Sequence, residues 1–357
     1  MYTVKIKTLT PLWTGDAYRK GETLRETGII GSLRWWYEAL IRGLGGTACD
    51  PTDTQCNDKS RCDACELFGC TGWSRKFRLE VNTEREITNL SFFIGSRKYI
   101  GAKRPVSGVV TKAPAVLTFT PLKEISSGEW QLLRESLQII ADKGALGGRT
   151  SQGNGAIKVI ENNLPVKNSK ISLKGTRANN INCINRPNLA DFFFWKYKIN
   201  FAKDIADLIK EKLFWTHASE HFNIPDNWDQ WKKVWKDYGI LPIAFHVRDT
   251  LRRSIENGEK RHELLGQRGK GSQIFVSHGY KKENNGSKSI EFRVFGYGTA
   301  DDLIKKLEED MNNRLSEKLF SSSTKKDSNE NITQIEFKAT TGKQIIEKLK
   351  DRLEVLR

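Results

Sequence analysis

Long apolar runs are missing from this sequence: no stretch of eighteen apolar residues occurs, which excludes a membrane-spanning helix. The first residues, Met1–Lys7, lack the apolar core of a secretory signal and alternate like a β-strand. No Gly-x-x-x-x-Gly-Lys-Ser/Thr motif is present, which argues against a P-loop ATPase. We therefore expect a cytoplasmic protein with no membrane partner.

Histidine is also scarce, with five in 357 residues and none before His217. His217 and His221 are four residues apart, but no Glu follows His217 as a His-Glu-x-x-His metal site requires. A metal-independent ribonuclease needs a general base near its substrate, and the first half of the chain has no histidine to supply one. We expect that the protein is not an enzyme.

Positive charge is in excess, because 59 Lys and Arg stand against 43 Asp and Glu, for a formal net charge of +16. An excess of this size favours polyanionic partners, with nucleic acid ahead of anionic lipid or acidic protein. The alternative is a generally basic, soluble surface without a fixed ligand.

The first half of the chain predicts a strand, a helix, strands, a second helix and a final strand. The first helix begins at Gly31-Ser32, with Ser32 as its N-cap, and the second follows Ser127-Gly128. This order is the split βαβ arrangement of ferredoxin-like domains. The strands are expected at residues 2–9, 76–81, 91–94, 115–119 and 156–160.

The second half repeats this order once a Trp-rich insertion is removed, so we predict an α+β protein with tandem ferredoxin-like (RRM-like, βαββαβ) domains. The first domain covers residues 1–162 and the second 163–357. The second carries a helical insertion at about 216–256, in which Trp228, Trp231 and Trp235 have helical spacing and are expected in the core.

A glycine-dense loop, residues 144–155, is the strongest local signal for function. Glycines let backbone amides approach a ligand, and Arg149 could contact phosphate while Gln152 donates a hydrogen bond. The alternative is a flexible connection between a helix and a strand. The candidate contacts to a bound anion in this loop are Gly147, Gly148, Arg149, Gln152, Gly153 and Gly155.

Further cations are candidates for phosphate contacts. Arg34 lies in the first turn of the helix predicted from Ser32, where a bound anion would be favoured, although an Arg34–Glu38 pair explains it equally well. Two basic clusters with aromatic residues could follow an RNA backbone, or could protect a solvated strand edge. Their expected contacts are Arg75, Lys76, Arg78 and Lys98.

Five of the six cysteines fall between Cys49 and Cys70. The Cys62-x2-Cys65 pair with two upstream thiols could hold a tetrahedral structural zinc, with disulfides as the competing interpretation. The zinc ligands would be Cys49, Cys56, Cys62 and Cys65, whereas Cys70 is expected to be a packed thiol.

Several motifs, in this order and spacing, resemble the RAMP proteins of CRISPR systems: Gly31-Ser32-Leu33-Arg34-Trp35-Trp36, Glu66–Trp73 and the loop 144–155. With Leu9–Asp16 added, the pattern is similar to the family of the first-numbered subunit of the Cmr complex, the type III-B RNA-targeting effector. The resemblance is dense over residues 1–160. It implies tandem ferredoxin-like domains, RNA contacts through the glycine-rich loop and no catalysis.

We therefore predict an RNA-binding subunit of a type III-B interference complex in antiviral defence. Its partners would be the CRISPR guide RNA, the target RNA and other Cmr subunits, with the contact near the 3′ end of the guide. The alternatives are a metal-independent endoribonuclease that processes CRISPR RNA, and a purely protein-assembly module.

Overall fold

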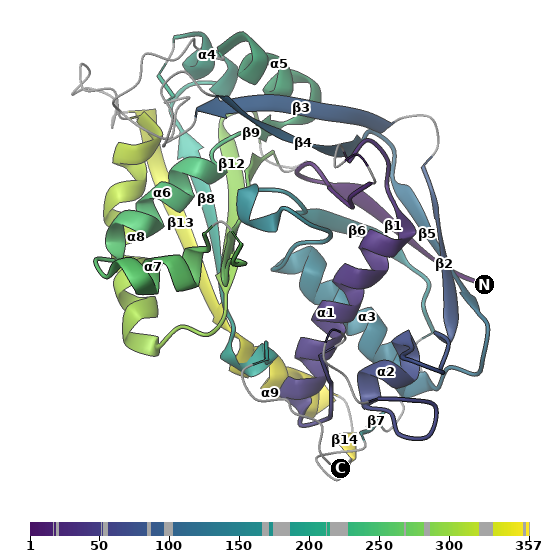
Figure 1. The fold of residues 1–357 in the computed structure, drawn as a ribbon. Helices are drawn as coiled ribbons and strands as arrows, with labels where there is room; N and C mark the ends of the chain where they lie inside the picture. The colour runs from purple at the N-terminus through teal and green to yellow at the C-terminus, as the bar shows by residue number, and fades with distance from the viewer. Residues whose placement is uncertain are drawn as a thin grey trace.

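The structure is a computed structural model of the 357-residue chain (Figure 1). It describes residues 1–16, 18, 21–50, 52, 56–83, 87–95, 103–165, 171–173, 186–211, 213–214, 228–267, 269–281, 286–320, 331–352 and 355–356. The α+β class predicted from the sequence is confirmed, with helices packed on antiparallel sheets. Within the described residues, no helix has the length and apolar character needed to cross a bilayer.

The first sheet has four strands, in the order β2-β5-β1-β6. These are β1 (Tyr2–Thr8), β2 (Phe77–Asn82), β5 (Ala115–Pro121) and β6 (Ile157–Asn162), and all three pairings are antiparallel. Two helices, α1 (Glu26–Leu44) and α3 (Ser127–Asp142), pack against the face that carries Val4 and Ile6. Alternation in β1 leaves Lys5 and Lys7 on the other face.

The predicted start of the first helix is wrong. Helix α1 begins at Glu26, with Arg25 as an N-cap that makes no side-chain capping bond. Ser32 lies inside the helix, where its hydroxyl accepts a hydrogen bond from the amide of Gly147 at 2.9 Å. The second helix, α3, begins at Ser127, close to its predicted start after Ser127-Gly128, and Ser126 and Glu129 form a capping box there.

A hairpin outside the first sheet contains the predicted strand 91–94. It consists of β3 (Ile87–Gly95) and β4 (Lys103–Thr111), which pair only with each other among the described strands. The apolar side chains of Val106 and Val110 pack with Val234 and Ile240 from the second half of the chain. The hairpin therefore reaches across to the other domain (Figure 1).

The second sheet is built from strands in residues 193–341, in the order β13-β8-β12-β11-β9, with β10 also paired to β12. Its strands are β8 (Phe193–Phe201), β9 (Ile240–Leu241), β10 (Ile274–Val276), β11 (Gly279–Tyr280), β12 (Ser289–Gly296) and β13 (Ile332–Thr341). Strand β8 alternates, so that Trp195, Tyr197 and Ile199 join the core of this half.

The segment predicted as a helical insertion at about 216–256 is mostly helical in the part that the structure describes, and its status as an insertion stays a prediction. Helix α6 (Ala244–Ser254) packs beside α8 (Asp301–Phe320) in the core of the second half, and β9 joins the sheet. Trp231 and Trp235 of α5 (Trp228–Tyr238) are buried, as the sequence predicts. Residues 215–227 of the insertion lie outside the described residues.

Four short helices and two short strands complete the described chain. They are α2 (Asp63–Phe68), α4 (Ile205–Lys210), α7 (Gly258–Leu265), α9 (Gly342–Arg352), β7 (Ile171–Ser172) and β14 (Val355–Leu356). Helix α9 belongs to the end of the chain yet packs on α1, where Ile346 leaves no room for a side chain at Gly43. The predicted domain boundary at residue 162 coincides with the end of β6 and stays a prediction.

The two halves share a continuous interface. Phe194 and Phe295 lie on the face of the second sheet that is not covered by helices of its own half. They contact Trp36 of α1, with ring centroids 6.3 and 5.5 Å apart. Arg293 of β12 is 4% exposed and reaches carbonyl oxygens of the first half. Helices of the first domain therefore cover part of the second sheet.

Candidate nucleic-acid interface and metal centre

The glycine-rich loop joins α3 to β6, but the amides expected to bind phosphate are occupied by the protein. The amide of Gly148 donates to the carbonyl of Trp13 at 2.7 Å, and that of Gly155 donates to the carbonyl of Pro11 at 2.9 Å. Those of Gly147 and Gly153 bond Ser32 Oγ and the Thr150 carbonyl. The expectation of a cradle made from these four amides is wrong.

The glycines are needed because the loop packs tightly against its neighbours. Gly147 has φ 80°, and a Cβ there would lie 2.5 Å from the carbonyl oxygen of Trp13. A Cβ on Gly148 would lie 2.8 Å from the Trp13 ring, and one on Gly155 would lie 2.3 Å from the Leu146 carbonyl oxygen. Such separations are sterically forbidden for real side chains, so close approach explains the glycine content.

Arg149 has a backbone conformation that is unusual for a residue other than glycine. Its φ of 55° is the single positive value at a non-glycine position in the described chain. The guanidinium lies 4.5 Å from the Trp13 ring centroid and donates from Nη1 to Ser107 Oγ at 3.2 Å. Burial lowers the pKa of Arg149, while nearby Asp16 opposes the shift. Gln152 is exposed beside it.

Arg34 is held inside the protein rather than at a helix start. Its Nε donates to Glu38 at 2.7 Å, and its Nη1 donates to the carbonyl of Gly69 at 2.9 Å. Because α1 begins two turns earlier, the main-chain amides around Arg34 lie in the helix interior. The helix-start argument for a bound anion is therefore wrong, and the ion pair with Glu38 is what the structure contains.

The basic cluster at residues 73–78 is mostly engaged in internal contacts. Lys76 Nζ lies 2.8 Å from a carboxylate oxygen of Glu129 and 3.1 Å from one of Glu66. The Arg75 Nε donates to the carbonyl of Phe77, whose ring is fully buried. Arg78 is exposed and pairs with Glu80 at 3.3 Å.

The rings of this cluster are covered as well. Arg61 and Lys123 both lie over Trp73, at 3.8 and 3.4 Å from its ring centroid, so cations already occupy the surfaces on which a base would stack. The cluster leads into β2, at the opposite edge of the first sheet from the strand that follows the glycine loop. The predicted residues are thus not assembled into one site, and Lys98 lies outside the described residues.

A histidine lies against the glycine loop, which the sequence did not indicate because it comes from the second half. The amide of His278 donates to the carbonyl of Gly153 at 3.1 Å, and a Cβ on Gly153 would lie 2.4 Å from His278 Nε2. His278 is fully buried, and its Nδ1 accepts from the amide of Ala244. Burial lowers the pKa of His278 to about 3, which favours the neutral ring.

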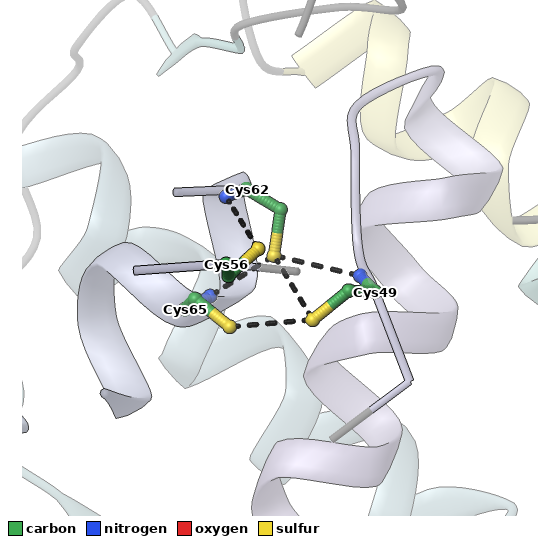
Figure 2. Close-up of side chains that lie close together, drawn as sticks. All are labelled: Cys49, Cys56, Cys62 and Cys65. Carbon is green, nitrogen blue, oxygen red and sulfur yellow. Dashed lines mark hydrogen bonds between the residues drawn. The ribbon is translucent and has the colours of Figure 1, made fainter. Parts of the chain in front are cut away.

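The four cysteines predicted as metal ligands do come together. The Sγ atoms of Cys49, Cys56, Cys62 and Cys65 all lie within 4.8 Å of one another, and all four residues are buried (Figure 2). The Cys49–Cys65 and Cys49–Cys62 sulfur separations are 3.3 and 3.7 Å. Two sulfurs bound at about 2.3 Å to a tetrahedral zinc lie about 3.8 Å apart, so the set fits that metal.

Donors around the cluster favour thiolates. The amides of Cys49 and Cys65 point at Cys62 Sγ from 3.5 and 3.3 Å, and Arg34 Nη2 lies 3.2 Å from Cys65 Sγ (Figure 2 shows the amide contacts). Hydrogen bonds from the Cys49 and Cys65 thiols, followed by those amides, lower the pKa of Cys62. Cys70 lies outside the cluster, with its Sγ 3.6 Å from the carbonyl of Asn57.

Comparison with known proteins identifies the first half of the chain. Residues 5–158 match the family model of the RAMP superfamily, so the resemblance seen in the sequence motifs is confirmed for this segment. No curated protein matches the sequence.

Solved CRISPR structures align with the chain at low identity. A chain of the type III-B Cmr-beta complex bound to cognate target RNA and AMPPnP is 11% identical, with 88% of this chain and 99% of that chain covered and a TM-score of 0.45. Cmr1 from Pyrococcus furiosus in its apo form is 12% identical, with coverages of 94% and 98% and a TM-score of 0.36. A chain of a type IV-B CRISPR complex is 15% identical, with coverages of 44% and 88% and a TM-score of 0.32.

Proposed function

We propose that the chain is a non-catalytic, RNA-binding subunit of a Cmr-type (type III-B) CRISPR interference complex. The observation that carries the proposal is the RAMP match over residues 5–158, the segment that holds Trp13 and Arg149. In this proposal the protein works in the cytoplasm with other Cmr subunits. It contacts guide or target RNA near the 3′ end of the guide.

The pair of Trp13 and Arg149 is the proposed contact in the first domain. A guanidinium can donate two parallel hydrogen bonds to a phosphate, and an aromatic ring beside it can support a base. A left-handed backbone at a non-glycine residue costs on the order of 1 kcal/mol, and such strain is found most often where a side chain has a task. The positive φ of 55° at Arg149 supports that interpretation.

Replacing Arg149 by Gly tests the contact with little risk to the fold, since glycine prefers the backbone conformation found there. We expect R149G to bind single-stranded RNA more weakly and with a shallower dependence on salt, and R149K to fall between R149G and the parent. Fluorescence anisotropy over a salt titration measures both. The control is R253A, which removes one exposed cation, paired with Asp249, from α6. Equal affinity for R149G, R253A and the parent would contradict the proposal.

The absence of catalysis is part of the proposal, and the placement of His278 supports it. A general base must reach the proton it removes, whereas His278 is fully buried and a pKa of about 3 makes its ring a poor base. We expect no specific cleavage when the chain is incubated with repeat RNA in EDTA. Specific cleavage that persists in EDTA would favour the alternative, a metal-independent endoribonuclease.

We also infer that both halves are ferredoxin-like. The β-α-β-β-α-β order places the fourth strand beside the first and the second beside the third, and the first sheet has this order with β6, β1, β5 and β2. The same places in the second sheet are taken by β13, β8, β12 and then β10 or β11. The repeated strand order supports a tandem arrangement.

We propose that Cys49, Cys56, Cys62 and Cys65 hold a structural zinc, which would link the loop after α1 to α2. Metal analysis should find one zinc per chain, and EDTA should lower the melting temperature because zinc binding contributes to folding. C62S should lose the metal, whereas the control C70S should keep it. A metal-free protein in which a thiol assay under denaturing conditions finds disulfides would contradict the zinc proposal.

A further inference from the structure

A basic cavity lies between the two halves, away from the glycine loop and the cysteines. Its volume is about 840 Å³, which is the size of a ligand site, and it is bounded by the ends of β1 and α3, by β6 and by the second sheet. Seven of its lining residues are basic and two are acidic. The cations that matter most for the argument are Lys7, Lys143, Lys158, Lys196 and Lys338.

The sheet registers set like charges opposite each other along this cavity. In the first sheet Lys7 of β1 is paired with Lys158 of β6. In the second, Lys196 of β8 is paired with Lys338 of β13 on one side and with Arg293 of β12 on the other. Like charges directly opposite on neighbouring strands are destabilising, so two such rows at one cavity call for a compensating function.

Two lysines on the same strands that do not line the cavity form ion pairs. Lys5, two residues from Lys7, pairs with Glu161 at 2.6 Å. Lys198, two residues from Lys196, pairs with Glu336 at 2.8 Å. Within the cavity Lys196 has Glu291 at 2.8 Å.

Lys143 lies near other lysines at this cavity. Lys143 donates to Thr340 Oγ1 at 3.3 Å, and among the described residues no carboxylate forms an ion pair with Lys143 or Lys338. Burial lowers the pKa of Lys143, the charge of the adjacent Asp142 opposes this shift, and the charges of Lys338, Lys348 and Lys196 lower the pKa further. Positive charge is therefore concentrated in the cavity at a cost to stability.

We infer that this cavity binds the phosphate backbone of single-stranded RNA, as a second contact beyond Trp13 and Arg149. The inference rests on the proposed RNA-binding function and adds a site to it. Ammonium groups neutralise phosphates without reading bases. Three of the four aromatic residues that line the cavity are almost fully buried, so stacking contributes little there; these are Phe194, Trp195 and Tyr280. Binding at this site is therefore independent of RNA sequence.

The two contacts are close enough along the chain for one RNA strand to reach both. Leu9 lines the cavity, and Trp13 follows four residues later. Four residues span at most about 14 Å when fully extended. Leu9 at the cavity and Trp13 at the first contact are therefore no more than about 14 Å apart.

The experiment compares variants of the full chain that each remove two charges. K143A/K338A and K7A/K158A remove cavity cations, and K5A/K198A removes two paired lysines from the same strands. Anisotropy with uridine and mixed-sequence RNA oligonucleotides is measured over a salt titration. Each lost phosphate contact on a single strand reduces the slope of log K against log salt by about 0.7, so each cavity variant should lose about 1.4, with either RNA, and K5A/K198A none. The melting temperature of K143A/K338A should equal or exceed that of the parent, because like charges have been removed.

Each result decides between the two proposals. If the cavity variants keep the parent slope while R149G loses affinity, the cavity inference is wrong and the proposed function stands. If K5A/K198A loses as much slope as the cavity variants, the loss reflects net charge and the inference is again wrong. If the parent chain shows no salt-dependent binding to RNA, the proposed function fails and the cavity site fails with it.

Discussion

Arg293 offers the sharpest test of how the two halves are held together. Its guanidinium is buried and donates from Nη1 to the carbonyls of Gly144 and Ile140 at 3.1 and 3.3 Å. It also donates from Nη2 to the carbonyl of Ile157 at 3.4 Å and from Nε to the Tyr280 hydroxyl at 3.0 Å. Two of these carbonyls lie at or just beyond the end of α3, where the helix dipole favours a cation. We therefore predict that R293M destabilises the whole chain.

The magnitude follows from the three carbonyls of the first half. A hydrogen bond to a charged group contributes about 1.5 to 3 kcal/mol, and the distances here place each bond at the lower end. Three such bonds amount to about 4 to 5 kcal/mol. Removing a buried charge recovers part of its desolvation cost, which leaves a loss of about 3 kcal/mol in the free energy of unfolding. R293K should lose less, because an ammonium still reaches one or two of the carbonyls.

Unfolding in guanidinium chloride, followed by tryptophan fluorescence, measures this difference in the free energy of unfolding, since the chain has ten tryptophans. The control is K260M, in which an exposed i,i+3 ion pair with Glu263 is lost at a cost of about 0.2 to 0.5 kcal/mol. A free energy of unfolding for R293M within about 0.5 kcal/mol of the parent would refute the argument, because it would show that Arg293 bears none of the interface.

Three further predictions follow from the described contacts. His278 is neutral in the fold with a pKa of about 3, so below pH 6.5 the unfolded chain binds a proton that the folded chain does not. The contribution of His278 to the free energy of unfolding is therefore fully present above pH 6.5 and falls by about 1.4 kcal/mol per pH unit below it. H278N should show a smaller loss of stability between pH 7 and pH 5, measured by urea unfolding. G153A should lower the melting temperature, because its Cβ would clash with His278, whereas G31A, in open space on α1, should raise stability by about 0.5 to 1 kcal/mol; equal effects would contradict this. K76M should cost about 1 to 2 kcal/mol, because it removes the ammonium group that pairs with the carboxylates of Glu129 and Glu66, and an unchanged unfolding midpoint would count against these pairs.

Local patterns were enough to find most of the elements. Period-two alternation located β1, and the apolar spacing after Ser127-Gly128 located α3, because these signals depend on neighbours within a few residues. The start of α1 was placed too late because Ser32 resembles an N-cap, whereas its hydroxyl instead serves the glycine loop 115 residues away. The cysteine set was found because four thiols with short spacings lie on one loop and one helix turn.

The proposed RNA contacts were harder to predict for a physical reason. The sequence shows that a residue is a cation but not which acidic residue pairs with it in the fold. Lys76, for example, pairs with Glu129, which lies on a helix 53 residues away. The same limit applies to the glycine loop, in which the amides of Gly147, Gly148 and Gly155 find partners in residues 11–32. The sequence therefore named residues with the right chemistry, several of which the fold uses internally.

The sequence alone determined the α+β class, the basic character, the RAMP resemblance of the first half and the identity of the clustered cysteines, because each depends on composition or on short spacings. Tertiary structure alone decided that His278 lies against Gly153 and that Lys7, Lys143 and Lys338 line one cavity. Sheet register and domain packing bring these residues together across long stretches of chain, and neither is encoded in a local pattern.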